Sequence, residues 1–363
     1  MKVGIITFQR AYNYGAVLQA YALCQKINSL GFSCEVIDYH CEKFERDYKK
    51  ISIFKAGSIR EFISAIVNGK TRNKKRAKFI DFVEREISLS PQKYYCENII
   101  DSNNEYDVFI TGSDQVWNLN LTDEDWNFFL AFVRLEKKKI SYAASIVAID
   151  NDKEIENKIK NCLDSFSRIT LRENSGVKYL LSLGYNSTKL VLDPTLLLTK
   201  EEWTELGKKY SMGMLLPKDY LLAYFVSPTQ TNYEQMKNLS EETNLPIVLI
   251  NYTHRKVDAV INLTTVSPGQ FVRLFMNATM VITNSFHGTA FSINLNKDFL
   301  YVLNIEKPEK NERINTLVNL LELSERDFRF ADINNEIDWT KVNKKLNKLR
   351  SESINILRDE IVN

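Results

Sequence analysis

A histidine able to transfer a proton is the first candidate that the sequence offers. Residues 283–289 join a short apolar run to a helix-like stretch, so that Ser285, His287, Gly288 and Thr289 would stand at the start of a helix. The positive end of a helix disfavours a protonated imidazole, which leaves His287 neutral and able to accept a proton. Gly288 would let a ligand approach the backbone closely. The pattern predicts a general acid or base at His287, and a purely structural histidine is the alternative.

A second group of polar residues follows a strand that we predict to end at residue 111. Ser113, Asp114, Gln115, Trp117 and Asn118 together offer hydrogen-bond donors, a carboxylate and an aromatic face. Such a set suits a sugar or a phosphate, because hydroxyls and phosphate oxygens need polar partners and a sugar ring packs on an aromatic side chain. The alternative is that Asp114 is a turn residue and Trp117 belongs to the core.

Two further loops carry groups that could bind an anion. Asn13, Tyr14 and Gly15 follow the first predicted strand and begin a helix, where backbone N–H groups and the helix dipole favour negative charge. Arg172 ends another predicted strand, and its guanidinium can hold a carboxylate or a phosphate through two hydrogen bonds. A salt bridge with Glu173 or another neighbour is the alternative. The chain contains neither the glycine-rich dinucleotide fingerprint nor a P-loop pattern.

The other charged and thiol-bearing segments indicate no metal site. The acidic residues 123–125 have no partners at metal-ligand spacing and are interpreted as a solvated turn. The five cysteines are scattered and form no pair separated by two residues, which argues against structural zinc and fits reduced thiols. The basic stretch from Lys70 to Lys78 is interpreted as a solvated helix face, and attraction to anionic membrane lipid is the alternative.

Short apolar runs alternating with amphipathic stretches would position these loops. This alternation is typical of strand–helix units with a parallel sheet, whose ligands bind outside the carboxyl ends of the strands. Two helices should begin at serine caps, Ser227 and Ser267, each followed by proline and then by glutamine three residues on. The strands are predicted near residues 3–8, 33–39, 106–111, 140–144, 168–171 and 189–192, and then near 220–226, 245–250, 280–283 and 299–303.

The pattern predicts two Rossmann-like α/β halves that face each other across a cleft. The first half would cover residues 1–196, interrupted by a polar helical insertion at about 40–104, and the second would cover residues 197–335. Residues 336–363 should form a C-terminal helix.

Composition excludes several classes of protein. The 363 residues are 44% hydrophobic and 26% charged, which is the usual globular mixture and not that of a disordered chain. With 48 basic and 46 acidic residues the net charge is +2, too small for nucleic-acid binding through overall basicity. No apolar run approaches the length of a membrane span or of a secretory signal. We therefore expect a soluble cytoplasmic protein that meets membranes only at their surface.

Taken together, these loops resemble the polysaccharide pyruvyl transferase family. The matches span roughly residues 3 to 330 and leave the insertion and the tail uncovered. The combination is more specific than any single piece. The matching segments are residues 13–21, 112–118, 172–176, 193–195 and 285–289, together with Arg313 and the leucines that follow it.

The resemblance implies a glycosyltransferase-B-like fold and the transfer of an enolpyruvyl unit from phosphoenolpyruvate to a sugar as a cyclic ketal. Phosphoenolpyruvate would be a co-substrate, with no other cofactor. The acceptor would be a glycan or a lipid-linked oligosaccharide at the cytoplasmic membrane face, in capsule or exopolysaccharide assembly. In this reading His287 would transfer protons, Asp114 would orient or deprotonate an acceptor hydroxyl, and Arg172 would bind the donor. Many relatives carry Arg-Leu-His where this chain has Ser285, Phe286 and His287, so other cations would have to hold the donor.

Two other functions remain open on the sequence. A glycosyltransferase that uses a nucleotide sugar could be built on the same fold, since a fold does not determine a reaction. A non-catalytic member could instead serve as a binding partner in a polysaccharide assembly complex.

Arg172 is the first candidate to bind phosphoenolpyruvate, followed by Arg313 and by Arg10, which lies in the loop after the first strand.

Overall fold

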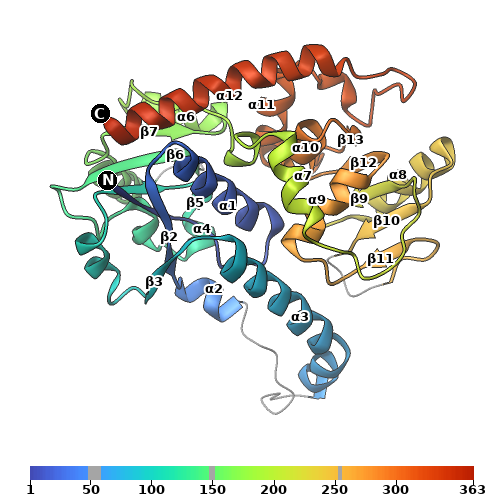
Figure 1. The fold of residues 1–363 in the computed structure, drawn as a ribbon, viewed down its shortest axis with the longest axis horizontal. Helices are drawn as coiled ribbons and strands as arrows, with labels where there is room; N and C mark the ends of the chain where they lie inside the picture. Colours follow the sequence, from blue (N-terminus) through green and yellow to red (C-terminus); the bar gives the residue numbers. More distant parts are fainter. Residues whose placement is uncertain (48–58, 147–151, 252–255) are drawn as a thin grey trace. The chain divides into compact units, whose positions relative to one another are not determined.

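The computed structural model describes residues 1–47, 59–146, 152–251 and 256–363. They form two compact α/β units, each with its own sheet (Figure 1). We call the first unit the N-terminal half and the second the C-terminal half. The N-terminal half comprises Met1–Lys49, Val83–Leu198 and Leu346–Asn363, and the C-terminal half comprises Lys50–Phe82 and Thr199–Lys345. The two Rossmann-like halves are as predicted, and the cleft expected between them stays a prediction.

The sheet of the N-terminal half follows the order β3-β2-β1-β4-β6-β7-β8, with β5 paired to β6. Its described strand pairs are all parallel. The central strands are short apolar runs buried on both faces, as parallel sheets covered by helices require. The strands are β1 (Lys2–Ile6), β2 (Ser33–Tyr39), β3 (Leu89–Tyr94), β4 (Val108–Thr111), β5 (Asp114–Trp117), β6 (Lys138–Ile146), β7 (Arg168–Leu171) and β8 (Lys189–Leu190).

Helices alternate with these strands along the chain. The first, α1, is nearly entirely buried and leads from β1 to β2. The helices are α1 (Tyr14–Ser29), α2 (Glu42–Asp47), α3 (Ile59–Glu86), α4 (Leu119–Thr122), α5 (Lys153–Leu163) and α6 (Asn174–Ser182), with short 3-10 turns η2 (Ile99–Asn104), η3 (Trp126–Phe129) and η4 (Pro194–Leu196).

The expected helical insertion at about 40–104 is wrong in its last part. Its residues 89–94 form β3, which pairs in parallel with β2 at the edge of the sheet. An edge strand needs few apolar residues, and this one exposes most of its middle and includes Pro91. The polar composition of residues 89–94 therefore did not indicate a strand. Residues 48–58 of the predicted insertion lie outside the described part of the chain.

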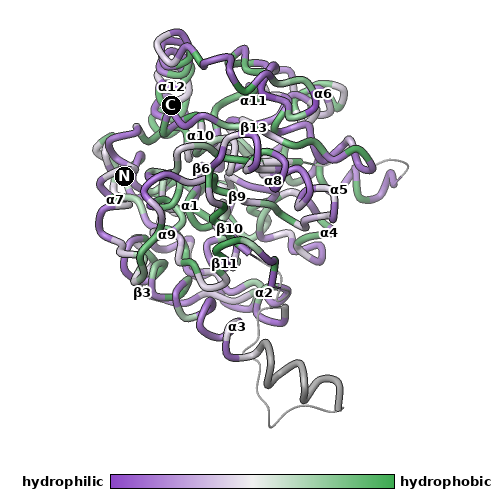
Figure 2. The backbone as a smooth tube through the Cα atoms, turned by 90° about the vertical axis from the view of Figure 1, so that its right-hand side faces the viewer, coloured by the Kyte–Doolittle hydropathy of each residue, from purple (hydrophilic) through white to green (hydrophobic). Residues whose placement is uncertain are grey.

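The C-terminal half contains a parallel sheet in the order β11-β10-β9-β12-β13. Green hydrophobic stretches run through its strands, whereas much of α8 and α12 is purple (Figure 2). The strands are β9 (Leu221–Tyr224), β10 (Ile247–Ile250), β11 (Ile261–Leu263), β12 (Met280–Thr283) and β13 (Asp298–Tyr301). The helices that follow along the chain are α7 (Lys200–Lys208), α8 (Gln230–Thr243), α9 (Pro268–Asn277), α10 (Phe286–Asn294), α11 (Glu312–Leu320) and α12 (Trp339–Val362), with 3-10 turns η5 (Pro308–Asn311) and η6 (Ser324–Arg326). Residues 59–82 of α3 also belong to this half, whereas α12 belongs to the N-terminal half from Leu346 on.

One predicted helix cap is confirmed and one is displaced. The Ser267 hydroxyl accepts a hydrogen bond from the Gln270 N–H at 3.1 Å, and the Gln270 side chain accepts one from the Ser267 N–H at 3.0 Å. For α8 the cap is Thr229, not Ser227, with Asn232 completing the capping box. Ser227 has a φ of +51°, a left-handed conformation that an N-cap does not adopt. The predicted C-terminal helix is α12.

Candidate functional site

In the C-terminal half, the loops after β9 and β12 meet where the strand order reverses. Asn284 ties these loops together. Its Oδ1 accepts from the Val226 N–H at 2.7 Å, and its Nδ2 donates to the Val226 carbonyl at 3.1 Å. Ligands of open parallel sheets bind at such a reversal, so the loop that enters α10 is the place where this half should bind one.

The start of α10 holds His287 in a tight turn. The Ser285 hydroxyl accepts from the Gly288 N–H at 3.4 Å, and the Ser285 carbonyl accepts from the Thr289 hydroxyl at 3.1 Å. A Cβ at Gly288 would lie 2.2 Å from the Thr283 hydroxyl oxygen, so the helix packs this closely against β12 only with glycine there. Gly288 therefore permits a close approach of α10 to β12, whereas the sequence analysis expected a ligand to approach the backbone there.

The predicted residues of this loop differ in what they can offer a ligand. Thr289 is fully buried, and Ser285 and His287 are 7% and 6% exposed. His287 occupies the second position of α10. Arg313 lies on α11, which packs against α10, and is half-buried.

In the N-terminal half, the corresponding reversal lies between β1 and β4 and is filled by side chains. The Thr7 hydroxyl donates to the Ser113 carbonyl at 3.0 Å and accepts from the Gln19 amide at 2.7 Å. Gln19 in turn accepts from the Ser113 N–H at 2.9 Å. Ser113, predicted to contact substrate, is fully buried and also bonds the Ala143 carbonyl at 2.8 Å. Its role is to fix the loop after β4.

The other polar residues of that loop divide between core and surface. Trp117 is 1% exposed, stacks on Phe129 and donates its indole N–H to the Phe128 carbonyl at 3.0 Å. The predicted binding contact of Trp117 is therefore corrected to a core role. Gln115 and Asn118 are half-buried and bond each other at 3.3 Å, so they remain accessible to a ligand.

The loop after β1 keeps one accessible polar group at the start of α1. Asn13 caps the helix, because its Oδ1 accepts from the Ala16 N–H at 3.3 Å, and it is half-buried. Tyr14 and Gly15 are buried in the first turn, so of the three predicted binding residues only Asn13 presents a side chain. The first turn of α1 carries no acidic residue that would oppose an anion.

Arg172 lies at the centre of a buried ionic cluster. Its guanidinium donates to Asp193 and to Asp114, each at 2.8 Å, and Glu173 lies 3.7 Å from its Nε. The Arg172 side chain is 0% exposed. Burial alone would lower the pKa of this guanidinium, but the charges of Asp114, Asp193 and Glu173 outweigh it and raise that pKa. The complete burial of Arg172 among carboxylates argues against the predicted donor contact, which stays a prediction.

Asp114 is the member of this cluster that reaches the surface, with 11% of its side chain exposed. Asp193 completes the cluster from a loop: its Oδ1 caps η4 through the Thr195 N–H at 2.9 Å. Arg172 thus orients Asp114 at the start of β5, where the carboxylate can meet a hydroxyl group.

Arg10 is also held by a carboxylate. Its Nε and Nη2 each donate to Asp38 at 2.7 Å. His40 lies beside the same carboxylate at 3.4 Å and bonds Glu45 at 2.9 Å. The hydrogen bond to Asp38 raises the pKa of His40. Because the Nε and Nη2 atoms of Arg10 already donate to Asp38, the structure gives less support to the predicted contact between Arg10 and phosphoenolpyruvate.

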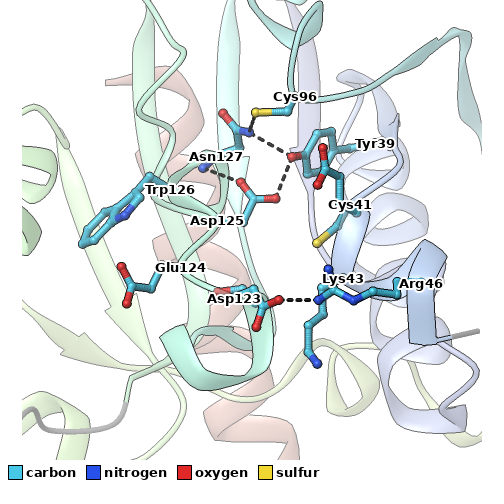
Figure 3. Close-up of a pocket in the computed structure, with 12 residues that line it drawn as sticks. Tyr39, Cys41, Lys43, Arg46, Cys96, Asp123, Glu124, Asp125, Trp126 and Asn127 are labelled. Carbon is cyan, nitrogen blue, oxygen red and sulfur yellow. Dashed lines mark hydrogen bonds and ion pairs between the residues drawn. The ribbon is translucent and has the colours of Figure 1, made fainter.

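A pocket of about 430 Å³ opens near the carboxyl end of β2 (Figure 3). The sequence analysis assigned no function to it. Asp125 and Asn127 point toward the Tyr39 hydroxyl, which donates to Asp125 at 2.6 Å and accepts from the Asn127 amide at 2.9 Å. Asp123 forms an ion pair with Arg46. The pocket is lined by Tyr39, Cys41, Glu42, Lys43, Arg46, Cys96, Thr122, Asp123, Glu124, Asp125, Trp126 and Asn127.

The buried groups of this pocket differ in their electrostatics from the more exposed groups at its rim. Burial, reinforced by the charge of Asp125, raises the pKa of Tyr39 and raises that of Cys41 to about 12, so both stay protonated near neutral pH. At the rim, Glu124 is exposed and Trp126 is half-buried, with the Lys158 ammonium 4.1 Å from its ring centre. Carboxylates, an amide and an indole face within one pocket of this volume can bind a sugar residue.

Sequence reasoning missed this pocket because it treated residues 123–125 as a solvated turn. A signal was present, since Trp126 and Asn127 directly follow the three acids, and acids beside an indole and an amide are a sugar-binding combination. Tyr39, which lines the other side of the pocket, lies far from the three acids in the sequence.

Among the residues that the structure describes, no three His, Cys, Asp or Glu side chains are grouped so that they could hold a metal ion. None of the described helices combines the length and the apolar character needed to cross a bilayer.

Two doubly wound parallel α/β halves define a fold of the glycosyltransferase-B-like class. The family model for polysaccharide pyruvyl transferase matches residues 13–305. The chain therefore belongs to the polysaccharide pyruvyl transferase family, and it is a transferase. No curated protein sequence matches it.

The chain is similar to two solved structures, one of which supports the fold. UDP-GlcNAc 2-epimerase from Neisseria meningitidis, bound to UDP-GlcNAc, aligns with a TM-score of 0.50 and 11% identity over 98% of this chain and 99% of that chain. UDP-GlcNAc 2-epimerase from Methanocaldococcus jannaschii aligns with a TM-score of 0.46 and 12% identity over 97% of this chain and 100% of that chain. At such identity the Neisseria structure supports the two-half architecture and nothing about the substrate.

Proposed function

We propose that this transferase moves the enolpyruvyl unit of phosphoenolpyruvate onto a glycan sugar and forms a pyruvate ketal. The observation that carries the proposal is the family match over residues 13–305, which contains the loops of Asn13, Asp114, Arg172 and His287. The acceptor we propose is a lipid-linked or free oligosaccharide of capsule or exopolysaccharide assembly on the cytoplasmic side of the membrane.

The reaction defines what the protein must supply. A proton adds to the methylene carbon of phosphoenolpyruvate, one sugar hydroxyl attacks the neighbouring carbon, and the C–O bond to phosphate breaks. A second hydroxyl then closes the ketal on the same carbon. Of the two hydroxyl protons, one makes up for the proton that forms the new methyl group, and the other leaves with phosphate. The protein therefore needs a proton carrier, a carboxylate near the hydroxyls and cations for the donor.

His287 is the proposed proton carrier. It stands at the strand reversal of the C-terminal half, on the first turn of α10, where the helix N-terminus favours the neutral imidazole. A neutral imidazole can accept a hydroxyl proton and then deliver it, which suits a reaction that both removes and adds protons.

Asp114 is the proposed carboxylate for the acceptor, and Arg172 is a positioning residue. The two hydrogen bonds from Arg172 hold Asp114 and Asp193 in place, so that Asp114 presents its carboxylate in one orientation. Arg313 replaces Arg172 as the first candidate to bind the donor, since it is half-buried on α11 beside α10.

The pocket of Figure 3 is the proposed binding site for an acceptor sugar. Trp126 would pack against a sugar ring, while Glu124 and Asp123 would accept hydrogen bonds from its hydroxyls. Glu124 is exposed and stands at a φ of +56°, so its loop presents the carboxylate outward.

A phosphate-release assay tests the proposal. Phosphate should appear only when phosphoenolpyruvate and an acceptor glycan are both present, and the product should gain the mass of a pyruvate ketal. Release of a nucleoside diphosphate from a nucleotide sugar, with no phosphate from phosphoenolpyruvate, would assign the glycosyltransferase alternative. Binding of a glycan without either release would assign the non-catalytic alternative.

Two variants separate the pocket from the reacting groups. Glu124→Gln should raise the KM for the acceptor by several-fold with little effect on kcat, because one charged hydrogen bond is weakened. Glu156→Gln is the matched control, an acid on α5 that does not line the pocket. An unchanged acceptor KM in Glu124→Gln would remove the pocket from the proposal.

A further inference from the structure

The segment between α7 and β9 can be followed in Figure 1. It contains large apolar side chains that are exposed to solvent. We call residues 211–218 the apolar loop; they read Ser-Met-Gly-Met-Leu-Leu-Pro-Lys. Leu215 is 96% exposed, the largest value for a large hydrophobic side chain among the described residues, and Met214 is 50% exposed. A single exposed leucine needs no explanation, but two adjacent ones in an apolar segment indicate a contact surface.

The exposure of the loop tip does not come from a loose backbone, because both ends are anchored on α9. At the beginning, the Ser211 carbonyl accepts from the Gln270 amide at 2.7 Å. Tyr210 packs on Gly269 so closely that a Cβ there would lie 2.2 Å from the ring. At the end, the Tyr220 hydroxyl donates to the Leu274 carbonyl at 2.7 Å. The fold therefore holds Met214 and Leu215 outward.

Two cations line the cavity beside the apolar loop, and the exposed carboxylate of Asp219 follows Lys218 in the chain. The loop borders a cavity of about 720 Å³, lined also by Tyr220, Arg273 and Asn277. Of the described residues that line this cavity, Lys218 and Arg273 carry positive charge and none is a carboxylate. An apolar tip flanked by cations matches the chemistry of a bilayer surface, where acyl chains lie beneath anionic headgroups.

The basic stretch from Lys70 to Lys78 fits a lipid surface less well. Lys78 donates to the Thr265 carbonyl at 2.6 Å and to the Gln270 side chain at 2.8 Å, so it is engaged within the C-terminal half. Burial lowers the pKa of Lys75 to about 7, which weakens its positive charge near neutral pH. The solvated face predicted for this stretch is partly wrong, because one side of the helix packs.

We propose that the apolar loop inserts Met214 and Leu215 into a bilayer that contains anionic lipid, with Lys218 and Arg273 at the headgroups. The occupant is thus a lipid surface and not a protein. The proposed contact with lipid depends on the apolar loop alone. Its use, which rests on the proposed function, is to bring the enzyme to a lipid-linked acceptor.

Vesicle sedimentation with the full chain tests this. The wild type should bind vesicles of phosphatidylcholine and phosphatidylglycerol better than phosphatidylcholine alone, and added salt should weaken the binding. Met214→Ser with Leu215→Ser should lower the partition coefficient roughly tenfold or more, since each side chain would lose its transfer into the acyl region. Lys218→Glu should weaken only the binding to anionic vesicles.

Ile305→Ser is the matched control, because Ile305 is 75% exposed in the same half but lies outside the apolar loop. It should bind vesicles as the wild type does. Equal binding by the double variant would overturn the proposal, as would a wild type that binds no vesicles. Self-association of the wild type that the double variant abolishes, without any lipid effect, would make the loop a contact between copies and also overturn it.

A second measurement does not depend on loss of binding. Leu215→Trp should show a blue-shifted emission with anionic vesicles that the wild type lacks, and an unchanged spectrum would refute insertion. Phosphate release with a soluble acceptor should be the same in all loop variants. Vesicle binding without phosphate release would leave this inference standing and refute the proposed function, and the reverse result would do the opposite.

Discussion

Removing the Arg172 guanidinium separates two roles that this residue could have. The sequence suggested that Arg172 binds the donor, which predicts a folded Arg172→Met variant without affinity for phosphoenolpyruvate. The structure buries the side chain completely between Asp114 and Asp193, with a hydrogen bond of 2.8 Å to each. In that environment the guanidinium is the counter-ion of the surrounding carboxylates, and its loss should first be felt in stability.

The magnitude follows from what the variant leaves behind. Methionine fills most of the arginine volume, so the cavity is small, but the carboxylates of Asp114, Asp193 and Glu173 remain close together without their cation. Breaking a buried ion pair by removing one partner costs about 3–5 kcal/mol, because an uncompensated charge stays in the interior. Arg172→Lys should lose less than Arg172→Met, since the charge is kept but not the planar two-pronged geometry.

Urea unfolding followed by circular dichroism measures these differences. Lys208→Met is the control, because its ion pair with Glu205 is exposed on both sides and should contribute little. If Arg172→Met lowers the free energy of unfolding by less than about 1 kcal/mol and abolishes phosphoenolpyruvate binding, the positioning role is refuted and direct donor binding is right.

Three other predictions concern stability, proton transfer and metal. Burial raises the pKa of Glu360 to about 8 from 4.5, so the folded chain holds a proton that the unfolded chain releases above about pH 4.5, and stability should fall as the pH rises from about 4.5 to about 8 and then level off. Glu360→Gln should remove that fall, worth roughly a few kcal/mol, when melting temperatures at acidic and alkaline pH are compared; an unchanged slope would contradict it. His287→Ala should lower kcat by ~10²-fold or more with an unchanged melting temperature, and a folded variant with full activity would end its assignment as the proton carrier. Activity should survive EDTA, and a loss restored by Mg²⁺ or Mn²⁺ would show that a metal takes part.

The alternation of apolar and amphipathic segments was sufficient to predict two parallel α/β halves. Periodicity is a local property, and each buried strand of a parallel sheet has to be apolar on both faces. The capping box at Ser267 was predictable for the same reason, since all its hydrogen bonds lie within three residues. The edge strand β3 was not, because one open side removes the demand for apolar residues.

The sequence by itself determined that the candidate polar residues would lie in the loops after the strands. Strand ends follow from the chain pattern, and the carboxyl ends of parallel strands share one edge of a sheet. Asn13, Asp114 and His287 were found in this way. Their residue types and positions also carried the family resemblance, which the match over residues 13–305 confirmed.

Only the tertiary structure decided which of these groups remain partly exposed and which are buried by packing and ion pairs. Arg172 meets Asp114 across 58 positions of the sequence, and Tyr39 meets Asp125 across 86. Such pairs depend on sheet order and register, which no local pattern encodes. A guanidinium at a strand end looks the same in sequence whether it points to solvent or to three carboxylates. The low dielectric of the interior then makes the buried arrangement a structural one, because a charge taken out of water has to be paired where it lies.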